Sequence, residues 1–144
     1  MHRSGFHVTT LLIAALACFS FHNPATAADA GQAIIPQLQE RFGLSEAQVR
    51  GSLGALLVFV RERLPKTQFD ELARCIPNAD FIMRDVRIRG IVNMPLDDIE
   101  DYEASLGSLG IGQPLASQFA PAVLEYLGAA GFDLERSMLA RVLD

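Results

Sequence analysis

Apolar residues recur at helical spacing through most of the chain after residue 33. In the segment GLSEAQVRGSLGALLVFVRERLP, Ser45 and Gln48 match a capping box, a side-chain pair that commonly begins a helix. The face that follows is apolar and carries Val49, Leu53, Leu56, Leu57, Val60 and Leu64. Since Val58 and Phe59 make the other side apolar as well, the pattern predicts a central helix of about five turns, packed on more than one side.

The same spacing predicts shorter helices around this central one. AIIPQLQERFG, at 33–43, predicts an opening helix. TQFDELARCIP predicts a helix that Thr67 caps and Pro77 ends. Further along the chain, GQPLASQFAPAVLEYLG predicts a helix that Pro121 either kinks or begins, because proline removes one backbone donor.

The end of the chain and its middle each add one more helix. We expect Asp133 to cap DLERSMLARVLD, a helix that places Leu134, Met138 and Val142 in the core. A further helix should start at Pro95, because proline is favoured in the first turn. The sequence therefore predicts an all-α fold, a small bundle of about five or six helices.

Two features of the central helix concern how helices pack. Gly51, Gly54 and Ala55 form a patch of small residues, which suits either a dimer groove or, as we prefer, a neighbouring helix of the same fold. RFGLSEAQVRGSLGALLVFV also aligns with SLGIGQPLASQFAPAVLEYL further along the chain, and each is followed by a short helix. This alignment indicates either a weak internal repeat of two helical hairpins or a chance similarity between amphipathic helices.

The first 27 residues have the pattern of a secretory signal peptide. An apolar run follows Arg3, and Ala25-Thr26-Ala27 offers a cleavage site before Ala28. The run is too short to cross the ~30 Å hydrocarbon layer, which needs about 20 apolar residues. Lipidation of Cys18 and an uncleaved anchor are the alternatives. We therefore predict export to the periplasm or beyond, and one mature all-α domain, residues 28–144, without a transmembrane helix.

Cleavage removes all three histidines, at positions 2, 7 and 22, and leaves one lysine and one cysteine, Cys75. Ser-His, Cys-His and His-metal sites cannot then be assembled, so we expect no enzyme and no cofactor. Cys75 is either a half-buried thiol or the site of an intermolecular disulfide. The formal charge of −5 becomes −6 once Arg3 is lost, which argues against nucleic acid and anionic membrane as partners.

The most concentrated charge lies in RDVRIRGIVNMPLDDIEDYEAS, residues 84–105. Val86 and Ile88 alternate with arginines at a strand-like period, which predicts an extended connector. The carboxylates that follow either bind a hard cation such as Ca²⁺ or form an exposed helical face that pairs loosely with the arginines, the interpretation we prefer. The candidate interaction residues are Arg84, Arg87, Arg89, Asp97, Asp98, Glu100, Asp101 and Glu103.

The segments FGLSEAQVRGSLGALLVFV, TQFDELARCIPNAD and LGIGQPLASQFAPAVLEYLGAAG resemble the bacterial VcgC/VcgE-type domain of unknown function. The resemblance covers nearly all of the predicted mature chain and implies no catalytic residues. The charged stretch departs from the family pattern, which tends to have a Gly/Ala-rich loop there. We therefore expect an exported, non-catalytic binding or interaction module of the bacterial envelope, with an unknown protein partner. Its alternatives are a lipid or apolar-ligand carrier, with a cavity between helical hairpins, and a carboxylate-based metal-binding protein using residues 97–103.

Overall fold

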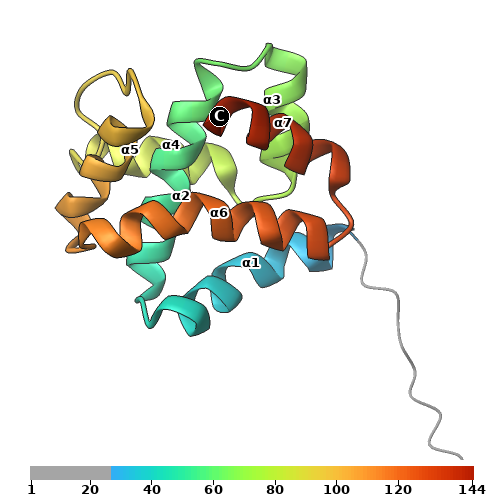
Figure 1. Ribbon diagram of the computed structural model, residues 1–144, viewed down its shortest axis with the longest axis horizontal. Helices are drawn as coiled ribbons and strands as arrows, with labels where there is room; N and C mark the ends of the chain where they lie inside the picture. Colours follow the sequence, from blue (N-terminus) through green and yellow to red (C-terminus); the bar gives the residue numbers. More distant parts are fainter. Residues whose placement is uncertain (1–26) are drawn as a thin grey trace, which may run out of the picture.

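The computed structural model describes the backbone of residues 27–144 and the side chains of residues 33–144. The predicted signal peptide as far as Thr26, and Cys18 within it, lie outside the described residues. The described part is all-helical, as predicted (Figure 1). Its elements are α1 (Ala27–Phe42), α2 (Glu46–Arg61), α3 (Lys66–Arg74), α4 (Ala79–Ile88), α5 (Ile99–Leu106), the 3-10 turn η1 (Gly107–Leu109), α6 (Gln113–Ala129) and α7 (Asp133–Leu143).

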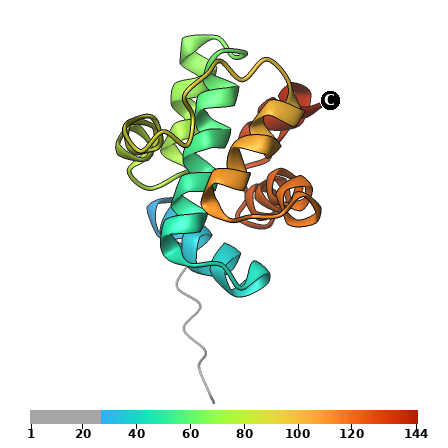
Figure 2. The same cartoon turned by 90° about the vertical axis from the view of Figure 1, so that its left-hand side faces the viewer.

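Helix α2 lies at the centre of the fold, as its two apolar sides predict. Its capping box is formed: Gln48 N–H donates to Ser45 Oγ over 3.2 Å, and Ser45 N–H donates to Gln48 Oε1 over 3.0 Å. Every residue from Gly51 to Val60 is buried. Figure 2 shows the reason, because α4 lies on one side of α2 while α5 and α6 lie on the other.

The small residues of α2 receive neighbours from the same fold. A Cβ atom added to Gly54 would lie 2.6 Å from Val86 Cγ1 and 2.8 Å from the carbonyl oxygen of Ile82, both in α4. A Cβ atom added to Gly51 would lie 2.7 Å from Leu109 Cδ1. The preferred interpretation of the small-residue patch is therefore confirmed, and α4 approaches α2 more closely than any larger residue at position 54 would allow.

Several helix boundaries differ from those predicted. Helix α3 begins at Lys66, after Pro65, so Thr67 is not its cap, and Asp133 is the first residue of α7 rather than its cap. Pro121 lies inside α6, which begins at Gln113 with Pro114 in its first turn. The opening helix is longer than predicted. Between residues 27 and 144 there are seven α-helices rather than five or six, because residues 79–88 form a helix of their own.

The core predicted from the apolar stripes is largely correct. On α2, Val49, Leu53, Leu56, Leu57 and Val60 are all buried. Leu64 and Val142 are only partly buried, and Leu134 is 61% exposed, so α7 buries Met138 and Leu139 instead. Within the described part of the chain, no helix is both long enough and apolar enough to cross a bilayer.

Candidate interaction surface

The charged stretch does not begin as an extended connector. Residues up to Ile88 belong to α4 and Arg89 is its C-cap, so the predicted strand-like segment is wrong. The alternation of polar and apolar residues that indicated a strand covers only the last four residues of this helix, 85–88. Val86 continues a helical face that packs against α2, with Ala79, Ile82 and Met83 on the same side. Gly90, with a φ of +70°, then ends the helix in the left-handed conformation that favours glycine.

Helix α4 presents a second apolar stripe to solvent. Phe81 is 60% exposed and Ile88 is 77% exposed. With Arg84, which is also exposed, they follow the i, i+3, i+7 spacing of a single helix face, opposite the residues that pack on α2. Single exposed apolar residues are common on protein surfaces, but two on one stripe beside arginines suit a protein contact. We call Phe81, Arg84, Arg87 and Ile88 the α4 outer face.

The three candidate arginines do not share one environment. Arg89 Nη1 lies 3.3 Å from Asp85 Oδ2, an ion pair within α4. Arg84 and Arg87 have no acidic side chain within 4.0 Å among the described residues. Together with Arg61 they line a hollow of about 310 Å³, whose wall also contains Asp80, Met83 and Ile88. Three arginines against one aspartate give this hollow a positive balance, which suits an anionic group.

The acidic residues are placed on and before α5, where two of them cap the helix. The helix begins at Ile99, so Pro95 is not in its first turn as predicted. Asp98 is the N-cap, and its Oδ1 accepts a hydrogen bond from Asp101 N–H over 2.8 Å. Asp101 Oδ2 accepts in turn from Asp97 N–H over 3.0 Å. These carboxylates satisfy backbone donors that the helix itself leaves free.

The remaining carboxylates do not assemble a cation site. Glu103 Oε2 accepts a hydrogen bond from Gln113 Nε2 over 2.6 Å, which ties α5 to the start of α6. Glu100 and the side chain of Asp97 are exposed. Across residues 33–144, no three Asp, Glu, Cys or His side chains are placed to hold a metal ion together. The metal-binding alternative therefore has no formed site in this part of the chain.

Arg63 holds the connector between α4 and α5 across the end of α2. Its Nη2 donates to the carbonyl oxygens of Leu96, over 2.8 Å, and Asp97, over 2.6 Å. Its Nη1 donates to the carbonyl oxygen of Phe59 over 2.8 Å, and the guanidinium carbon lies 3.7 Å from the centre of the Phe59 ring. One side chain thus fixes two loop residues to the last turn of α2.

This connector separates the two charged groups. It carries the chain from α4, on one side of α2, to α5 on the other (Figure 2). No carboxylate of residues 97–103 lies within 4.0 Å of Arg84, Arg87 or Arg89. The loose pairing predicted between arginines and carboxylates is therefore not formed. The arginines and the carboxylates instead belong to separate surfaces.

A second hollow lies beside α5, with a volume of about 410 Å³. Its wall contains the apolar residues Ile91, Val92, Leu96 and Ala104. Asp97 and Asp101 lie at the same hollow, and so does Met94, which is 72% exposed. We call this the acidic hollow. It offers an apolar recess next to negative charge.

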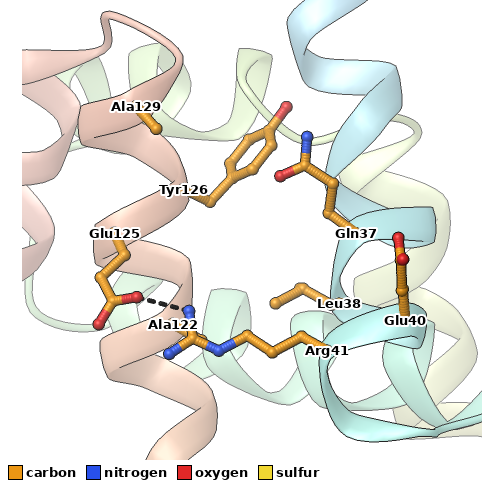
Figure 3. A pocket seen from close by; sticks show the side chains of 8 residues that line it. All are labelled: Gln37, Leu38, Glu40, Arg41, Ala122, Glu125, Tyr126 and Ala129. Carbon is orange, nitrogen blue, oxygen red and sulfur yellow. Dashed lines mark hydrogen bonds and ion pairs between the residues drawn. The ribbon is translucent and has the colours of Figure 1, made fainter.

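A groove between α1 and α6 has a charged rim (Figure 3). Arg41 forms an ion pair with Glu125 across it, and this hydrogen bond raises the pKa of the guanidinium and lowers the pKa of the carboxyl. Gln37 and Glu40 add polar groups to a volume of about 390 Å³. Small-molecule sites for apolar ligands are lined mainly by apolar side chains. Leu38, Ala122 and Ala129 line the groove as well, so it combines an apolar lining with a charged rim.

The single thiol of the described residues is poorly placed for chemistry. Cys75 is 3% exposed, and its Sγ lies 3.8 Å from the carbonyl oxygen of Glu71. Burial, and then the charge of Glu135, raise the pKa of this thiol to about 12. Because the thiolate is the reactive form, burial disfavours reaction of Cys75 in the folded chain. An intermolecular disulfide through Cys75 would require local unfolding.

Comparison with known families adds a classification. A family model described as protein of unknown function VcgC/VcgE (DUF2780) matches residues 17–142. The chain belongs to this family. No curated protein and no solved structure matches it. The resemblance to VcgC/VcgE proteins seen in the sequence is thus confirmed, while the family description assigns no function. What this VcgC/VcgE protein does must be argued from its surfaces.

Three residues of these surfaces escaped the sequence reasoning. Phe81 and Ile88 belong to one exposed stripe only if residues 79–88 are helical, and the strand-like interpretation hid this. A helical projection of 79–88 would have found them, since it separates Ala79, Ile82, Met83 and Val86 from the rest. Arg63 gave no comparable signal, because its partners are backbone carbonyls 33 and 34 residues away.

Proposed function

We propose that this VcgC/VcgE protein is an exported, non-catalytic interaction module of the bacterial envelope, and that it binds a protein partner through the α4 outer face. The observation that carries the proposal is the exposure of Phe81 and Ile88 beside Arg84 and Arg87, which lack acidic partners among the described residues. Apolar anchors next to charge suit a protein contact, because the anchors supply affinity and the charges supply orientation and rate.

Export is part of the proposal and rests on the sequence of residues 1–27. The expected mature N-terminus is Ala28, and the expected location is the periplasm or the medium. Cell fractionation followed by mass spectrometry of the mature chain tests this. A lipid on Cys18, or a chain that still begins at Met1, would contradict it.

We propose that the protein is not an enzyme, because the expected cleavage before Ala28 removes every histidine. A chain beginning at Ala28 contains no histidine, and its only cysteine is the buried Cys75. Nucleophilic and general-base mechanisms that need an imidazole are then out of reach.

A repeat of two hairpins also belongs to this proposal, with α2 and α3 forming one unit and α6 and α7 the other. The helix bounds support it. The N-caps of α2 and α6 are Ser45 and Gly112, which are aligned residues of the two segments, and Gly43 and Gly110 before them both have positive φ. Duplication of a hairpin would explain how the flanking helices follow one plan while α4 and α5 form an insertion between them.

The test of the α4 outer face replaces Arg84, Arg87 and Arg89 by serine. The matched control replaces Arg74, Arg136 and Arg141, which are exposed arginines on α3 and α7, so both variants lose the same charge. Proteins crosslinked to each variant in intact envelopes are then compared at low and high salt. The expected result is a partner that wild type and control both retain and that the folded α4 variant loses. A folded α4 variant that keeps every partner at both salt concentrations would overturn the proposal.

A further inference from the structure

We infer that the partner of the α4 outer face is a second copy of this chain, which presents its acidic hollow. This inference rests on the proposed function, because it uses the same surface, and it names the occupant. Two observations carry it: the charges of the two surfaces and their shapes.

The two surfaces have opposite charge. Arg61, Arg84 and Arg87 surround the hollow beside α4, with Asp80 as the acidic side chain there. The acidic hollow has Asp97 and Asp101 in its wall, and the exposed Asp98 and Glu100 lie at the same end of α5. Complementary patches of this kind steer two proteins together and fix their orientation. The mature chain would carry a net negative charge, so a positive patch is unusual on its surface. The acidic hollow of a second copy has the opposite charge and could bind this patch.

The shapes of the two surfaces are complementary as well. Ile88 projects from the end of α4 with 77% of its surface exposed, and Phe81 lies two turns away on the same stripe. The acidic hollow has a volume of about 410 Å³, and its mixed wall includes the apolar residues Ile91, Val92 and Leu96 beside Asn93, Ser105 and Ser108. Burial of an isoleucine side chain against the apolar part of this wall is favourable because it removes apolar surface from water. The apolar stripe of one copy therefore has a receiving site on the next.

The positions of the surfaces determine the kind of assembly. Helices α4 and α5 lie on opposite sides of α2 (Figure 2), and the acidic hollow is formed by α5 together with the connector that follows α4. A contact between the α4 outer face of one copy and the acidic hollow of another is heterologous. It leaves one surface of each kind free on the pair, so growth continues until a ring closes or a filament forms.

A charge-swap experiment tests this contact. Variant A carries Arg84→Glu and Arg87→Glu, which makes both surfaces acidic. Variant B carries Asp97→Lys and Glu100→Lys, which cancels the net negative charge of the acidic hollow and leaves the α4 outer face basic, and these two side chains form no hydrogen bond among the described residues. Control C carries Arg136→Glu and Arg141→Glu on α7, the same charge change as variant A away from both surfaces. Sedimentation velocity of the purified proteins over a range of concentrations gives the degree of association, and circular dichroism checks the fold.

The expected result is that wild type and control C associate and that A and B alone require at least ~10-fold higher concentration. An equimolar mixture of A and B should regain association, because the basic α4 outer face of B can bind the unchanged acidic hollow of A. The double variant Phe81→Ser with Ile88→Ser should remain monomeric. A wild-type protein that stays monomeric at every concentration, or an A–B mixture no more associated than A alone, would overturn the inference. Loss of an envelope partner by the triple-serine variant would still support the proposed function in that case, so the two failures are distinguishable.

Discussion

Helices α4 and α5 both flank α2, but they are held there in different ways. Helix α4 packs its backbone against Gly54 and buries four apolar residues, and its opposite face is left to solvent. Helix α5 buries Tyr102 and Leu106, and it is anchored through its ends: Asp98 caps it, Arg63 fixes its connector and Glu103 ties it to α6. Phe81 and Ile88, on the outer face of α4, are mostly exposed, so we expect them to contribute little to the stability of the fold. Their exposed apolar side chains are therefore free to serve binding, and stability and binding should be separable by mutation.

The largest expected effect lies in α2, on which both flanking helices depend. Leu57 is 1% exposed, so Leu57→Ala should lower the free energy of unfolding by about 2 to 5 kcal/mol through lost apolar contact and a residual cavity. The matched control is Ile88→Ala on the α4 outer face, for which we expect less than about 0.5 kcal/mol. Urea denaturation followed by circular dichroism measures both. Similar losses for the two variants would mean that the α4 outer face is part of the core.

The attachment of α4 can be broken at a single glycine. Gly54→Ala places a Cβ atom 2.8 Å from the backbone oxygen of Ile82, which cannot move without moving α4, so we expect a loss of about 1 to 3 kcal/mol. Gly51→Ala meets only the end of the Leu109 side chain, at 2.7 Å, and this can rotate away. Alanine also favours the helix by about 1 kcal/mol over glycine, so Gly51→Ala should be neutral or stabilising. Equal destabilisation in a denaturant series would contradict the close approach of α4.

These two helices also show what the sequence could predict. Helix α2 combines a capping box with a long apolar period, signals that lie within a few residues of each other, so its start, its two-sided packing and its core followed from local rules. Helix α4 is ten residues long, and its last four residues alternate as a strand would. Four residues do not separate the two periods, and the buried face appears only when all ten residues are projected as a helix, which places Val86 with Ala79, Ile82 and Met83.

Only part of the candidate site could be predicted from the sequence, again because local patterns are visible there and long-range contacts are not. The charged residues were found, because clusters of charge are visible in the sequence. Their separation by α2 was not, since it depends on Arg63 bonding to backbone atoms of Leu96 and Asp97, a contact without a side-chain signal. Capping by Asp98 illustrates the middle case. An aspartate at the start of a helix is expected to cap it. The predicted helix start at Pro95, however, placed Asp98 inside the first turn instead of at the N-cap.

The next prediction concerns the anchoring of the connector to α5. Arg63→Met keeps an apolar stem over Phe59 and removes the donors to Leu96 and Asp97, so we expect a loss of about 1.5 kcal/mol. Arg61→Met removes an exposed arginine at the same end of α2 and serves as the control, with less than about 0.5 kcal/mol expected. Hydrogen exchange should show faster exchange in α5 for Arg63→Met and unchanged exchange in α4. Equal loss of protection from hydrogen exchange in α4 and α5 would contradict the separate anchoring of α5.

The smallest expected effect separates capping from metal binding at the start of α5. Asp98→Ala removes the acceptor of Asp101 N–H and should cost about 1 kcal/mol, whereas Asp98→Ser retains an acceptor and should cost only a few tenths, about 0.3 kcal/mol. Glu100→Ala, in the same turn but without a side-chain hydrogen bond among the described residues, removes only its interaction with the helix dipole and should cost about 0.3 kcal/mol. Urea midpoints with and without millimolar CaCl₂ measure all three variants beside wild type, and we expect Ca²⁺ to leave every midpoint unchanged. If Ca²⁺ instead stabilised wild type and Asp98→Ser abolished that gain, these carboxylates would be cation ligands, because serine preserves the cap but removes the charge that Ca²⁺ requires.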